Sequence, residues 1–514
     1  MDFITGLKRT ETQRTEKGAL GYKTTGNTLL DMHGFISSYR FENEEKIGNL
    51  FLHALSEDPY YAAIWMFHVR DVRGGAKEKR LFNILFKIFS RNYPEISIRL
   101  LPLIAEYGYW KDLVNLYSQN VLKSSIIDLF RIQLNEDISN LEANRPVSLL
   151  AKWLPSSNAS SSNTRKLAYS IRKRLGLNEV SYRKILRDLR KKCNIVETDM
   201  SANRWEKIDY EKVASRANIL YNKAFLRHDE SRRRNFLEAA KKGEKKINSK
   251  TLFPHEIVHN LFNASNKGEK DTLEVLWKAL PDYIEGAENI LPVIDTSGSM
   301  FSSAIPGSKF CALDVAWALG IYCSEKLSGQ FKNQVMTFST NPKLVTLPQS
   351  SLEHKLLYLR ANSINESTRI DKVFKLILDV ALRNCLSQEE LPSKILIISD
   401  GEFDRMSSSS SSYFFSKEDL ERSIEQNNIL FEEVQELYLQ KGYKLPELIF
   451  WNVCGRTKTI SMQRNELGFK MLSGFSEAGF KMALSDKTDP LESLKEILDS
   501  DRYEAVRNTI MKEG

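Results

Sequence analysis

The run from Ile290 to Asp295 constrains the fold more than any other part of the chain. It reads ILPVID, five apolar residues that end in an aspartate, and TSGSM follows at once. A short apolar run bounded by turn-forming residues predicts a buried strand, and such strands are typical of parallel sheets covered by helices on both faces. The oxygen-bearing side chains of Asp295, Ser297 and Ser299 are then expected just beyond the carboxyl end of that strand.

Strands and helices alternate from residue 289 to residue 514. We predict strands at 290–295, 334–338, 394–400 and 447–453, an edge strand at 344–347, and helices at 309–326, 371–384, 417–440 and 490–499. This alternation predicts an α/β doubly wound, Rossmann-like domain over residues 289–514. Ligands of such sheets bind beyond the carboxyl ends of the strands.

Residues 26–288 instead have the apolar spacing of amphipathic helices. Apolar residues recur at i, i+3, i+4 and i+7 in two clear examples, which are Ile47, Leu50, Phe51, Ala54 and Leu81, Ile84, Leu85, Ile88. Strand patterns are scarce here, so we expect an α-helical array of the HEAT-like repeat kind. The polar residues 1–25 predict a flexible N-terminal tail, and PSSNASSSN at 155–163 predicts a loop.

Composition and cysteine usage narrow the class of protein. The chain has 514 residues, 42% of them hydrophobic and 27% charged, which is ordinary for a globular protein of two or three domains. Its five cysteines are widely spaced and form no C-x-x-C pair, which argues against a disulfide framework or a cysteine zinc site. No apolar stretch approaches the roughly 20 residues that span a bilayer. We expect a cytoplasmic protein in a reducing compartment, without a membrane partner.

A second aspartate and a threonine complete a candidate metal site. Asp400 ends the apolar run ILIIS, and Thr368, with Ser367 as its rival, precedes a predicted helix. The carboxyl ends of parallel strands share one edge of a sheet, so we expect Asp295, Ser297, Ser299, Thr368 and Asp400 to converge there. Hydroxyl and carboxylate oxygens suit a hard divalent cation, Mg²⁺ first, with Mn²⁺ or Ca²⁺ as alternatives.

The segment around Asp295 has two other interpretations. A glycine-containing turn that caps a helix would also place Asp and Ser there. A nucleophilic role for Ser297 needs a nearby base, and His354 is the single histidine after residue 289. We therefore assign no catalytic residue and expect a binding protein rather than an enzyme.

Positive charge is concentrated in residues 151–250. This segment holds 26 Lys and Arg against 11 Asp and Glu, a net charge of +15, whereas residues 291–514 carry −4. Clustered cations on predicted helices are typical of proteins that bind phosphate backbones. The candidate nucleic-acid-binding residues are Arg165, Lys166, Arg172, Lys173, Arg174, Arg183, Arg187, Arg190, Lys191, Arg232, Arg233 and Arg234.

A plain, solvated basic surface is the alternative for this segment. The aromatic residues among the cations fit core positions as well as base-stacking positions, so none is singled out. These aromatic residues are Trp153, Tyr169, Tyr182, Trp205, Tyr210 and Tyr221.

The sequence at 255–259 matches the H-E-x-x-H motif of zinc peptidases. His255, Glu256 and His259 read HEIVH, which on a helix would place both histidines on one face with a general base between them. A third ligand is required. Pro254 favours a helix start, so capping and packing roles are the simpler interpretation.

Several segments resemble a known family. The matching segments include GNTLLDMHG, FHVRDVRGGAKEKRLF, EYGYWKDL, LFPHEIV, PVIDTSGSM, STRIDKVFKLIL and ISDGEFD. Nearly the whole chain resembles an uncharacterised plant, protist and viral family that is distantly similar to the Ro autoantigen. The resemblance implies a TROVE-like helical module that binds structured or misfolded small RNA, followed by a von Willebrand factor A-like domain with a metal-ion-dependent adhesion site.

These observations favour a non-enzymatic ribonucleoprotein scaffold. Basic helices would hold RNA, and the metal site would bind an acidic group of a protein partner. The alternatives are a protein-interaction module without RNA binding and a zinc metallopeptidase acting through residues 255–259.

Overall fold

The computed structural model describes residues 12–14, 20–193, 195–284, 287, 289–302, 310–338, 341–363, 370–401, 430–454, 469–473, 477–484 and 489–511. The chain forms two compact units, each built from two stretches of sequence. We call residues 1–43 with 249–497 the α/β unit, and residues 44–248 with 498–514 the helical unit. The domains predicted from the sequence are instead residues 26–288 and 289–514, preceded by a tail at 1–25.

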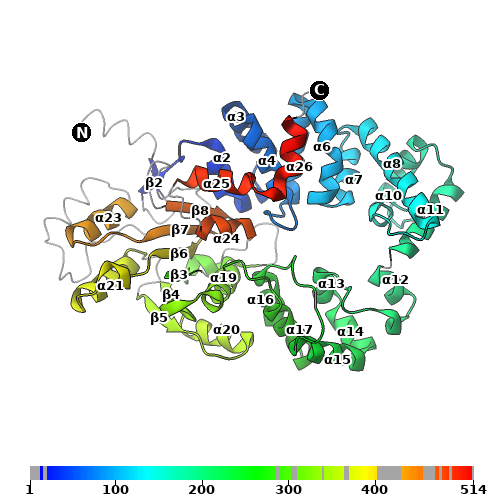
Figure 1. The fold of residues 1–514 in the computed structure, drawn as a ribbon. Coiled ribbons are helices and arrows are strands. Elements are labelled where there is room, and N and C mark those ends of the chain that lie inside the picture. The colour runs from blue at the N-terminus through cyan, green and yellow to red at the C-terminus, as the bar shows by residue number, and fades with distance from the viewer. Residues whose placement is uncertain are drawn as a thin grey trace. The chain divides into compact units, whose positions relative to one another are not determined.

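A six-stranded sheet, counted over the described residues, is the centre of the α/β unit (Figure 1). Its order is β5-β4-β3-β6-β7-β8, and all neighbours are parallel except β4 and β5. The strands are β3 (Ile290–Asp295), β4 (Gln334–Phe338), β5 (Lys343–Thr346), β6 (Lys394–Ser399), β7 (Glu447–Asn452) and β8 (Phe469–Ser473). The chain reverses direction across the sheet between β3 and β6, which is the topological switch point of a doubly wound fold.

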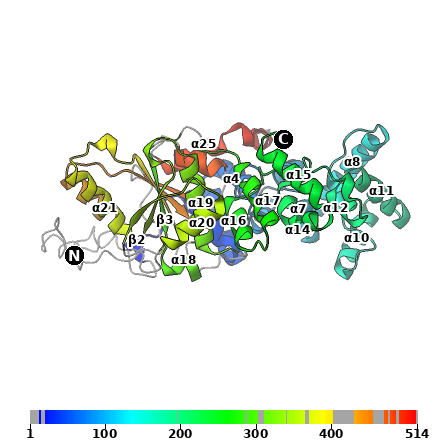
Figure 2. The same cartoon turned by 90° about the horizontal axis from the view of Figure 1, so that it is seen from below.

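Helices lie on both sides of this sheet. The helices are α16 (Pro254–Phe262), α17 (Lys267–Lys278), α18 (Gly298–Ser302), α19 (Ala312–Lys326), α20 (Leu352–Ala361), α21 (Ile370–Arg383), α23 (Leu430–Gln440), α24 (Glu477–Leu484) and α25 (Pro490–Leu498). Figure 2 shows α19 and α20 on one side of the strands and α21 on the other. The predicted order of a helical region followed by an α/β sheet is therefore confirmed.

The N-terminal segment, residues 1–43, belongs to the α/β unit. β1 (Thr12–Arg14) and β2 (Leu20–Tyr22) form an antiparallel pair within the predicted tail at 1–25, of which residues 1–11 and 15–19 lie outside the described residues. α2 (Thr28–Gly34) packs against β8, and Asn452 of β7 donates a hydrogen bond of 3.5 Å to the carbonyl of Gly34. η1 (Ile36–Arg40) follows.

The helical unit is a succession of amphipathic helices. They are α3 (Glu44–Glu57), α4 (Pro59–Arg70), α5 (Lys79–Asn92), α6 (Pro94–Tyr107), α7 (Trp110–Ser118), α8 (Lys123–Glu142), α9 (Leu150–Trp153), α10 (Ser162–Arg174), α11 (Glu179–Lys192), α12 (Val196–Ser201), η2 (Trp205–Lys207), α13 (Ser215–Leu220), α14 (Asn222–His228) and α15 (Glu230–Lys241). The predicted apolar faces form its core: Ile47, Phe51, Leu81 and Leu85 are at most 2% exposed. Burial of these faces drives the packing of α3, α4 and α5 against one another.

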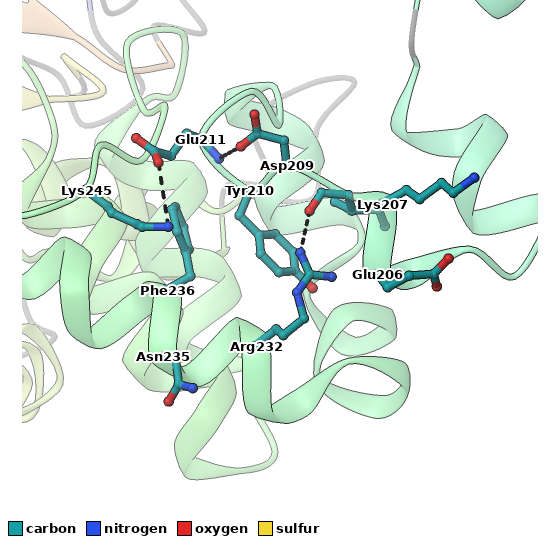
Figure 3. Close-up of a pocket in the computed structure, with 10 residues that line it drawn as sticks. Glu206, Lys207, Asp209, Tyr210, Glu211, Arg232, Asn235, Phe236 and Lys245 are labelled. Atoms are coloured by element: carbon teal, nitrogen blue, oxygen red, sulfur yellow. Dashed lines mark hydrogen bonds and ion pairs between the residues drawn. The ribbon is translucent and has the colours of Figure 1, made fainter.

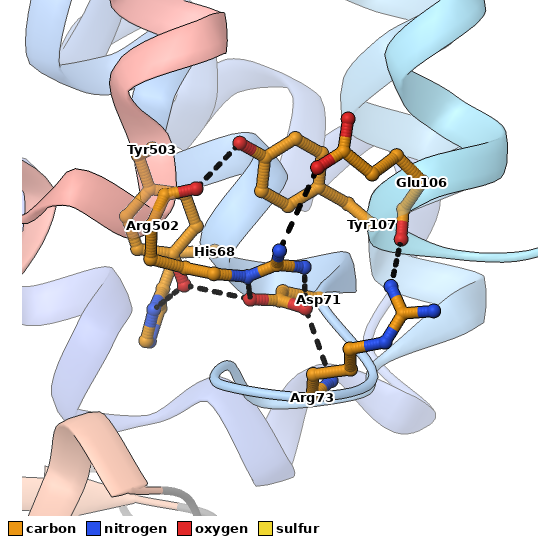
Figure 4. A network of polar contacts seen from close by, with 7 residues as sticks. All are labelled: His68, Asp71, Arg73, Glu106, Tyr107, Arg502 and Tyr503. Atoms are coloured by element: carbon orange, nitrogen blue, oxygen red, sulfur yellow. Dashed lines mark hydrogen bonds and ion pairs between the residues drawn. The ribbon is translucent and has the colours of Figure 1, made fainter.

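The last residues of the chain complete the helical unit. η5 (Asp501–Tyr503) and α26 (Glu504–Met511) pack against α4 and α6. Figure 4 shows the polar network that joins them, with Arg502 and Tyr503 turned toward Asp71 and His68. We call the network of His68, Asp71, Tyr107, Arg502 and Tyr503 the C-terminal clasp.

The structure also bears on membrane association. Over the described residues, no helix combines the length and the apolar character needed to cross a bilayer.

Candidate metal centre and candidate nucleic-acid interface

The carboxylate of Asp295 is fixed at the end of β3. All six residues of this strand are buried, and Asp295 is 0% exposed. The backbone N–H of Ser297 donates to Asp295 Oδ1 at 2.9 Å, and the hydroxyl of Ser399 donates to Asp295 Oδ2 at 2.6 Å. Because both oxygens are held, the orientation of this carboxylate is set before any ligand arrives.

Two serine hydroxyls lie beside the carboxylate of Asp295. The Oγ atoms of Ser297 and Ser299 are 3.0 Å apart, and Ser297 is fully buried. Ser299 lies on α18, which begins at Gly298, so the turn from β3 into this helix brings the two side chains together. Ser297 and Ser299 therefore lie together just beyond the end of β3.

Asp400 approaches from the neighbouring strand. It follows β6, which pairs with β3 in parallel, and it is 0% exposed. Burial, together with the negative charge of Asp400, raises the pKa of Asp295 to about 7. Two buried carboxylates that repel each other beside two hydroxyls form a donor set that a hard divalent cation would neutralise.

Three points qualify the predicted ligand set. Thr368 lies outside the described residues. Ser399 was missed, although its position directly before Asp400 on an apolar strand could have identified it. Within the described ranges, no three His, Cys, Asp or Glu side chains are grouped so as to hold a metal ion. A cation here would therefore depend on two carboxylates and on hydroxyl oxygens.

The HEIVH segment has structural roles. Glu256 lies in the first turn of α16, where its carboxylate accepts the backbone N–H of Phe253 at 2.8 Å in a capping box. The His255 ring stacks on Phe253 with 5.1 Å between centroids, and His259 Nδ1 lies 3.8 Å from Asp314. Over the described residues, His255 and His259 are not part of any group of three or more His, Cys, Asp or Glu side chains that could hold a metal ion.

Basic side chains line a cleft beside α11. This cleft, which we call the α11 cleft, has a volume of about 800 Å³. Six of its lining residues are cations and none is a carboxylate; the residues are Ser156, Ser157, Asn158, Val180, Tyr182, Arg183, Lys184, Leu186, Arg187, Arg190, Lys191, Thr198 and Arg204. Four of the predicted nucleic-acid-binding residues, Arg183, Arg187, Arg190 and Lys191, therefore share one concave surface.

The guanidinium of Arg190 donates hydrogen bonds to other residues of the protein. It donates to the carbonyls of Ala151 and Leu154 at 2.8 and 2.7 Å and to Ser156 Oγ at 2.7 Å. Arg190 therefore holds the loop at 154–156 against α11. Its direct contact with nucleic acid, which the sequence analysis proposed, is replaced by a positioning role.

The predicted residues on α10 are placed at its surface. Arg165, Lys166, Lys173 and Arg174 are exposed, and Arg172 is half-buried. Tyr169 of the same helix is 54% exposed, and the Arg172 guanidinium lies 5.2 Å from the centre of its ring. Among the described residues of 151–250, Tyr169 is the one large aromatic side chain exposed to this degree. It is the functional candidate that the sequence did not single out.

The three consecutive arginines of α15 have different surroundings. Arg233 is 0% exposed and lies over the rings of Tyr210, Phe225 and Phe236 at 4.9, 5.3 and 5.5 Å. Burial lowers the pKa of Arg233 to about 10, so it is still charged at neutral pH. This corrects the prediction of Arg233 as a nucleic-acid contact, because solvent does not reach it.

Arg232 and Arg234, which flank Arg233 on α15, are both paired with acidic side chains. Arg232 donates to Asp229 at 2.9 Å and to the carbonyls of Trp205 and Ile208, and Arg234 lies 2.7 Å from Glu230. Figure 3 shows Arg232 in a pocket of about 500 Å³ whose lining also includes Glu206, Asp209 and Glu211. This mixed-charge surface suits a phosphate backbone less well than the α11 cleft.

Comparisons with known proteins cover both parts of the chain. Residues 289–512 match the model of a family described as "Domain of unknown function (DUF7788)", and residues 15–125 and 177–288 match "Domain of unknown function (DUF2828)". Both parts match families of unknown function. The segment between the two stretches of the second match, 126–176, contains α10, whereas α11 lies inside the matched residues.

Individual proteins are similar over nearly the whole length. The chain is 28% identical over 524 residues to the "Uncharacterized protein L728" of Acanthamoeba polyphaga mimivirus, covering 94% of this chain and 87% of that one. The crystal structure of the Ro (RSR) protein of Deinococcus radiodurans aligns over 92% of this chain and 93% of its own, with a TM-score of 0.32 and 11% identity. A TM-score of this size supports no inference about ligands, so the proposals below rest on the residues of this chain.

Proposed function

We propose that the protein is a non-enzymatic scaffold that binds RNA through its helical unit. The observation that supports this most directly is the α11 cleft, where six cations and no carboxylate line one concavity. Binding to a nucleic-acid backbone gains free energy mainly by releasing counterions, which requires cations that are not already paired with acids. Arg183, Lys184 and Lys191 meet this requirement within the described residues, whereas Arg187 is paired with Asp188 and Arg204 with Asp199.

We further propose that a divalent cation, preferentially Mg²⁺, binds beside Asp295. Ser297 and Ser299 would supply hydroxyl oxygens, with Thr368 as a further ligand, while Asp295 and Asp400 would supply charge and orient bound water. With few formal charges from the protein, the cation would remain electrophilic enough to bind a carboxylate of a protein partner. The raised pKa of Asp295 supports this proposal, because a cation would relieve the repulsion from Asp400 that contributes to it.

A salt series tests RNA binding by the full chain. Gel shifts with a structured small RNA should show affinity at low salt that falls steeply as salt rises, by about 0.7 to 0.9 logarithmic units of affinity for each phosphate contact and each tenfold increase in salt. Absence of any RNA affinity at 50 mM salt contradicts the proposal.

The metal site also favours a second function, in which the protein binds only other proteins. In that case, capture of a partner should survive nuclease treatment and should be lost with a chelator or with Asp295→Ala. An RNA-dependent capture would instead favour the scaffold.

Tyr169 provides a test on α10. An exposed aromatic ring among cations can stack on a base, and removing such a contact costs about 1–3 kcal/mol. Tyr169→Ala should therefore weaken RNA binding by about 5-fold to 150-fold, since 1.4 kcal/mol corresponds to a factor of ten. Fluorescence anisotropy measures the change. Tyr358→Ala, which removes a 42% exposed tyrosine of the α/β unit, is the control and should leave the affinity unchanged.

A further inference from the structure

The α11 cleft is bounded by a row of cations on one helix face. Arg183, Arg187 and Lys191 are four residues apart along α11, and all three are exposed. Arg187 also lies 2.9 Å from Asp188, and because this ion pair is exposed it is weak enough for a phosphate to replace the carboxylate. A spacing of four residues gives an axial separation of about 6 Å. This distance is comparable to the separation of successive phosphates along one nucleic-acid strand. One strand that runs along α11 could therefore place a phosphate beside each cation of the row.

The opposite wall is a short loop that is held in place. Arg190 ties Leu154 and Ser156 to α11 by hydrogen bonds of 2.7 Å each. The buried hydroxyl of Tyr182 donates to the carbonyl of Pro155 at 2.9 Å, so a second side chain of α11 fixes the same loop. The shape of the cleft is thus set by the folded protein, which lowers the entropic cost of binding a ligand in it.

A free hydroxyl faces this cationic environment. Ser157 lines the cleft, and its Oγ atom is buried without a hydrogen-bond partner within the described residues. Ser157 as a residue is only partly buried, and its hydroxyl is a donor whose hydrogen bond an oxygen in the cleft can accept. Beside several cations, an anionic oxygen such as that of a phosphate is the acceptor that fits this position best.

Apolar groups in the same cleft indicate which form of nucleic acid fits. Val180 is 77% exposed at the cleft, and Leu186 also lines it. A duplex is recognised across its wide grooves and keeps its bases stacked inside, whereas a single strand exposes bases that can pack on apolar side chains. A concavity of about 800 Å³ has room for a few nucleotides and not for the cross-section of a double helix.

We infer that the α11 cleft binds a short single-stranded segment of RNA. In this complex Arg183, Arg187 and Lys191 contact successive phosphates, Ser157 donates a hydrogen bond to a phosphate oxygen, and Val180 packs against a base. Arg190 acts as a positioning residue through the loop at 154–156. This inference rests on the proposed RNA-binding function and specifies the form of RNA and the residues that hold it.

The experiment compares two RNAs and three variants of the full chain by fluorescence anisotropy. The probes are a labelled 12-nucleotide single strand and the same strand annealed to its complement. The wild-type protein should bind the single strand at least tenfold more tightly than the duplex. Arg183→Glu combined with Arg187→Glu should weaken single-strand binding by at least tenfold. Losing two phosphate contacts should also lower the magnitude of the salt slope by about 1.4.

The matched control reverses two cations with the same spacing on another helix of the same unit. Lys223 and Arg227 are both exposed on α14, so Lys223→Glu combined with Arg227→Glu makes an equal change in net charge. This variant should bind within about threefold of wild type. Ser157→Ala, a small change that preserves the fold, should weaken single-strand binding by several-fold without changing the salt slope.

Each outcome has a distinct meaning. Equal loss in the cleft variant and in the control would overturn the inference, because net charge alone would then explain binding. Duplex binding as tight as single-strand binding would overturn it as well. If the chain binds RNA and the cleft variant is unaffected, the inference fails while the proposed function stands. If neither probe nor a structured RNA binds at low salt, the proposed function itself fails.

Discussion

Asp71→Ala is expected to lower the free energy of unfolding of the helical unit by about 3–5 kcal/mol, the usual cost of removing one partner of a buried ion pair. Asp71 is 0% exposed and accepts two hydrogen bonds from Arg502, both of 2.8 Å. It also accepts the backbone N–H of Arg73 at 3.0 Å and the hydroxyl of Tyr503 at 3.3 Å. Alanine would leave all of these donors without their acceptor.

The rest of the C-terminal clasp increases this cost. His68 Nδ1 and the Tyr503 hydroxyl are 2.9 Å apart, and burial lowers the pKa of His68 to about 4, so its imidazole is neutral at neutral pH. The Tyr107 hydroxyl donates to the carbonyl of Arg502 at 2.6 Å, and the Arg502 guanidinium lies 4.4 Å from the centre of the Tyr107 ring. Removing Asp71 therefore disturbs several contacts that join residues more than 390 positions apart.

Thermal and urea unfolding of the full chain, followed by limited proteolysis of the helical unit, measure this effect. Asp128→Ala is the control, because it removes an exposed ion pair with Arg131 whose loss should cost at most about 1 kcal/mol. Deletion of residues 498–514 should destabilise the helical unit at least as much as Asp71→Ala. An Asp71→Ala protein as stable as the control variant would contradict this account of the clasp.

The clasp also predicts sensitivity to acid. Burial alone would raise the pKa of Asp71, but hydrogen bonds from Arg502 and Arg73 lower it below its ordinary value. A lowered carboxyl pKa in the folded state contributes stability above the unfolded pKa of about 4, and this contribution is lost as the pH falls through the folded pKa. The difference in stability between wild type and Asp71→Ala should therefore shrink below pH 4.

Local sequence patterns were sufficient to predict much of the sheet. The strands at 290–295 and 334–338 have the predicted bounds, because each is a short apolar run followed by turn-forming residues. β8 was not predicted. It contains Lys470, which is 0% exposed and lies 2.8 Å from Glu447 of β7. A lysine argues against a buried strand until its partner on the neighbouring strand is known, and that pairing depends on the tertiary fold.

Some residues of the candidate sites could likewise be predicted from local sequence patterns, and others could not. Asp295, Ser297 and Asp400 could be predicted because the carboxyl ends of parallel strands share one edge. Which arginine of RRR is buried follows from the phase of α15, where Arg233 lies on the same face as Phe236 and Leu237, at spacings of three and four. That spacing was a usable signal. The role of Arg190 was not readable, because its partners are carbonyls 36 and 39 residues away.

The C-terminal clasp could not be inferred from local patterns at all. Arg502 and Tyr503 follow the α/β sequence directly, yet their partners lie in α4, α6 and the turn after α4. Nothing in the sequence near Asp71 distinguishes it from a surface aspartate. Only the return of the chain to the helical unit after α25 buries this carboxylate against an arginine.

Addition of Mg²⁺ to chelator-treated protein is expected to stabilise the α/β unit, by about 2.7 kcal/mol when the free metal exceeds its dissociation constant a hundredfold. The pH dependence follows from Asp295, whose pKa is raised to about 7 by burial and by the charge of Asp400. A carboxyl with a raised pKa binds its proton more tightly in the folded state. The contribution of Asp295 to the stability of the metal-free unit should therefore be fully present below the ordinary carboxyl pKa of about 4 and should be lost as the pH rises toward 7.

The stabilisation of the α/β unit by Mg²⁺ should have the opposite pH dependence. A cation competes with the proton for the same group of oxygens, so the stabilisation by Mg²⁺ should be small at pH 5.5 and should grow as the pH rises through 7. Differential scanning calorimetry at both values measures this difference. Asp295→Asn removes the titrating charge and should abolish both the metal response and its pH dependence. Asp379→Asn, which changes a partly exposed carboxylate of α21, should retain both. A metal-induced shift of equal size in the Asp295→Asn protein would mean that the cation binds elsewhere, because the carboxylate held by Ser297 and Ser399 would then be unnecessary for its binding.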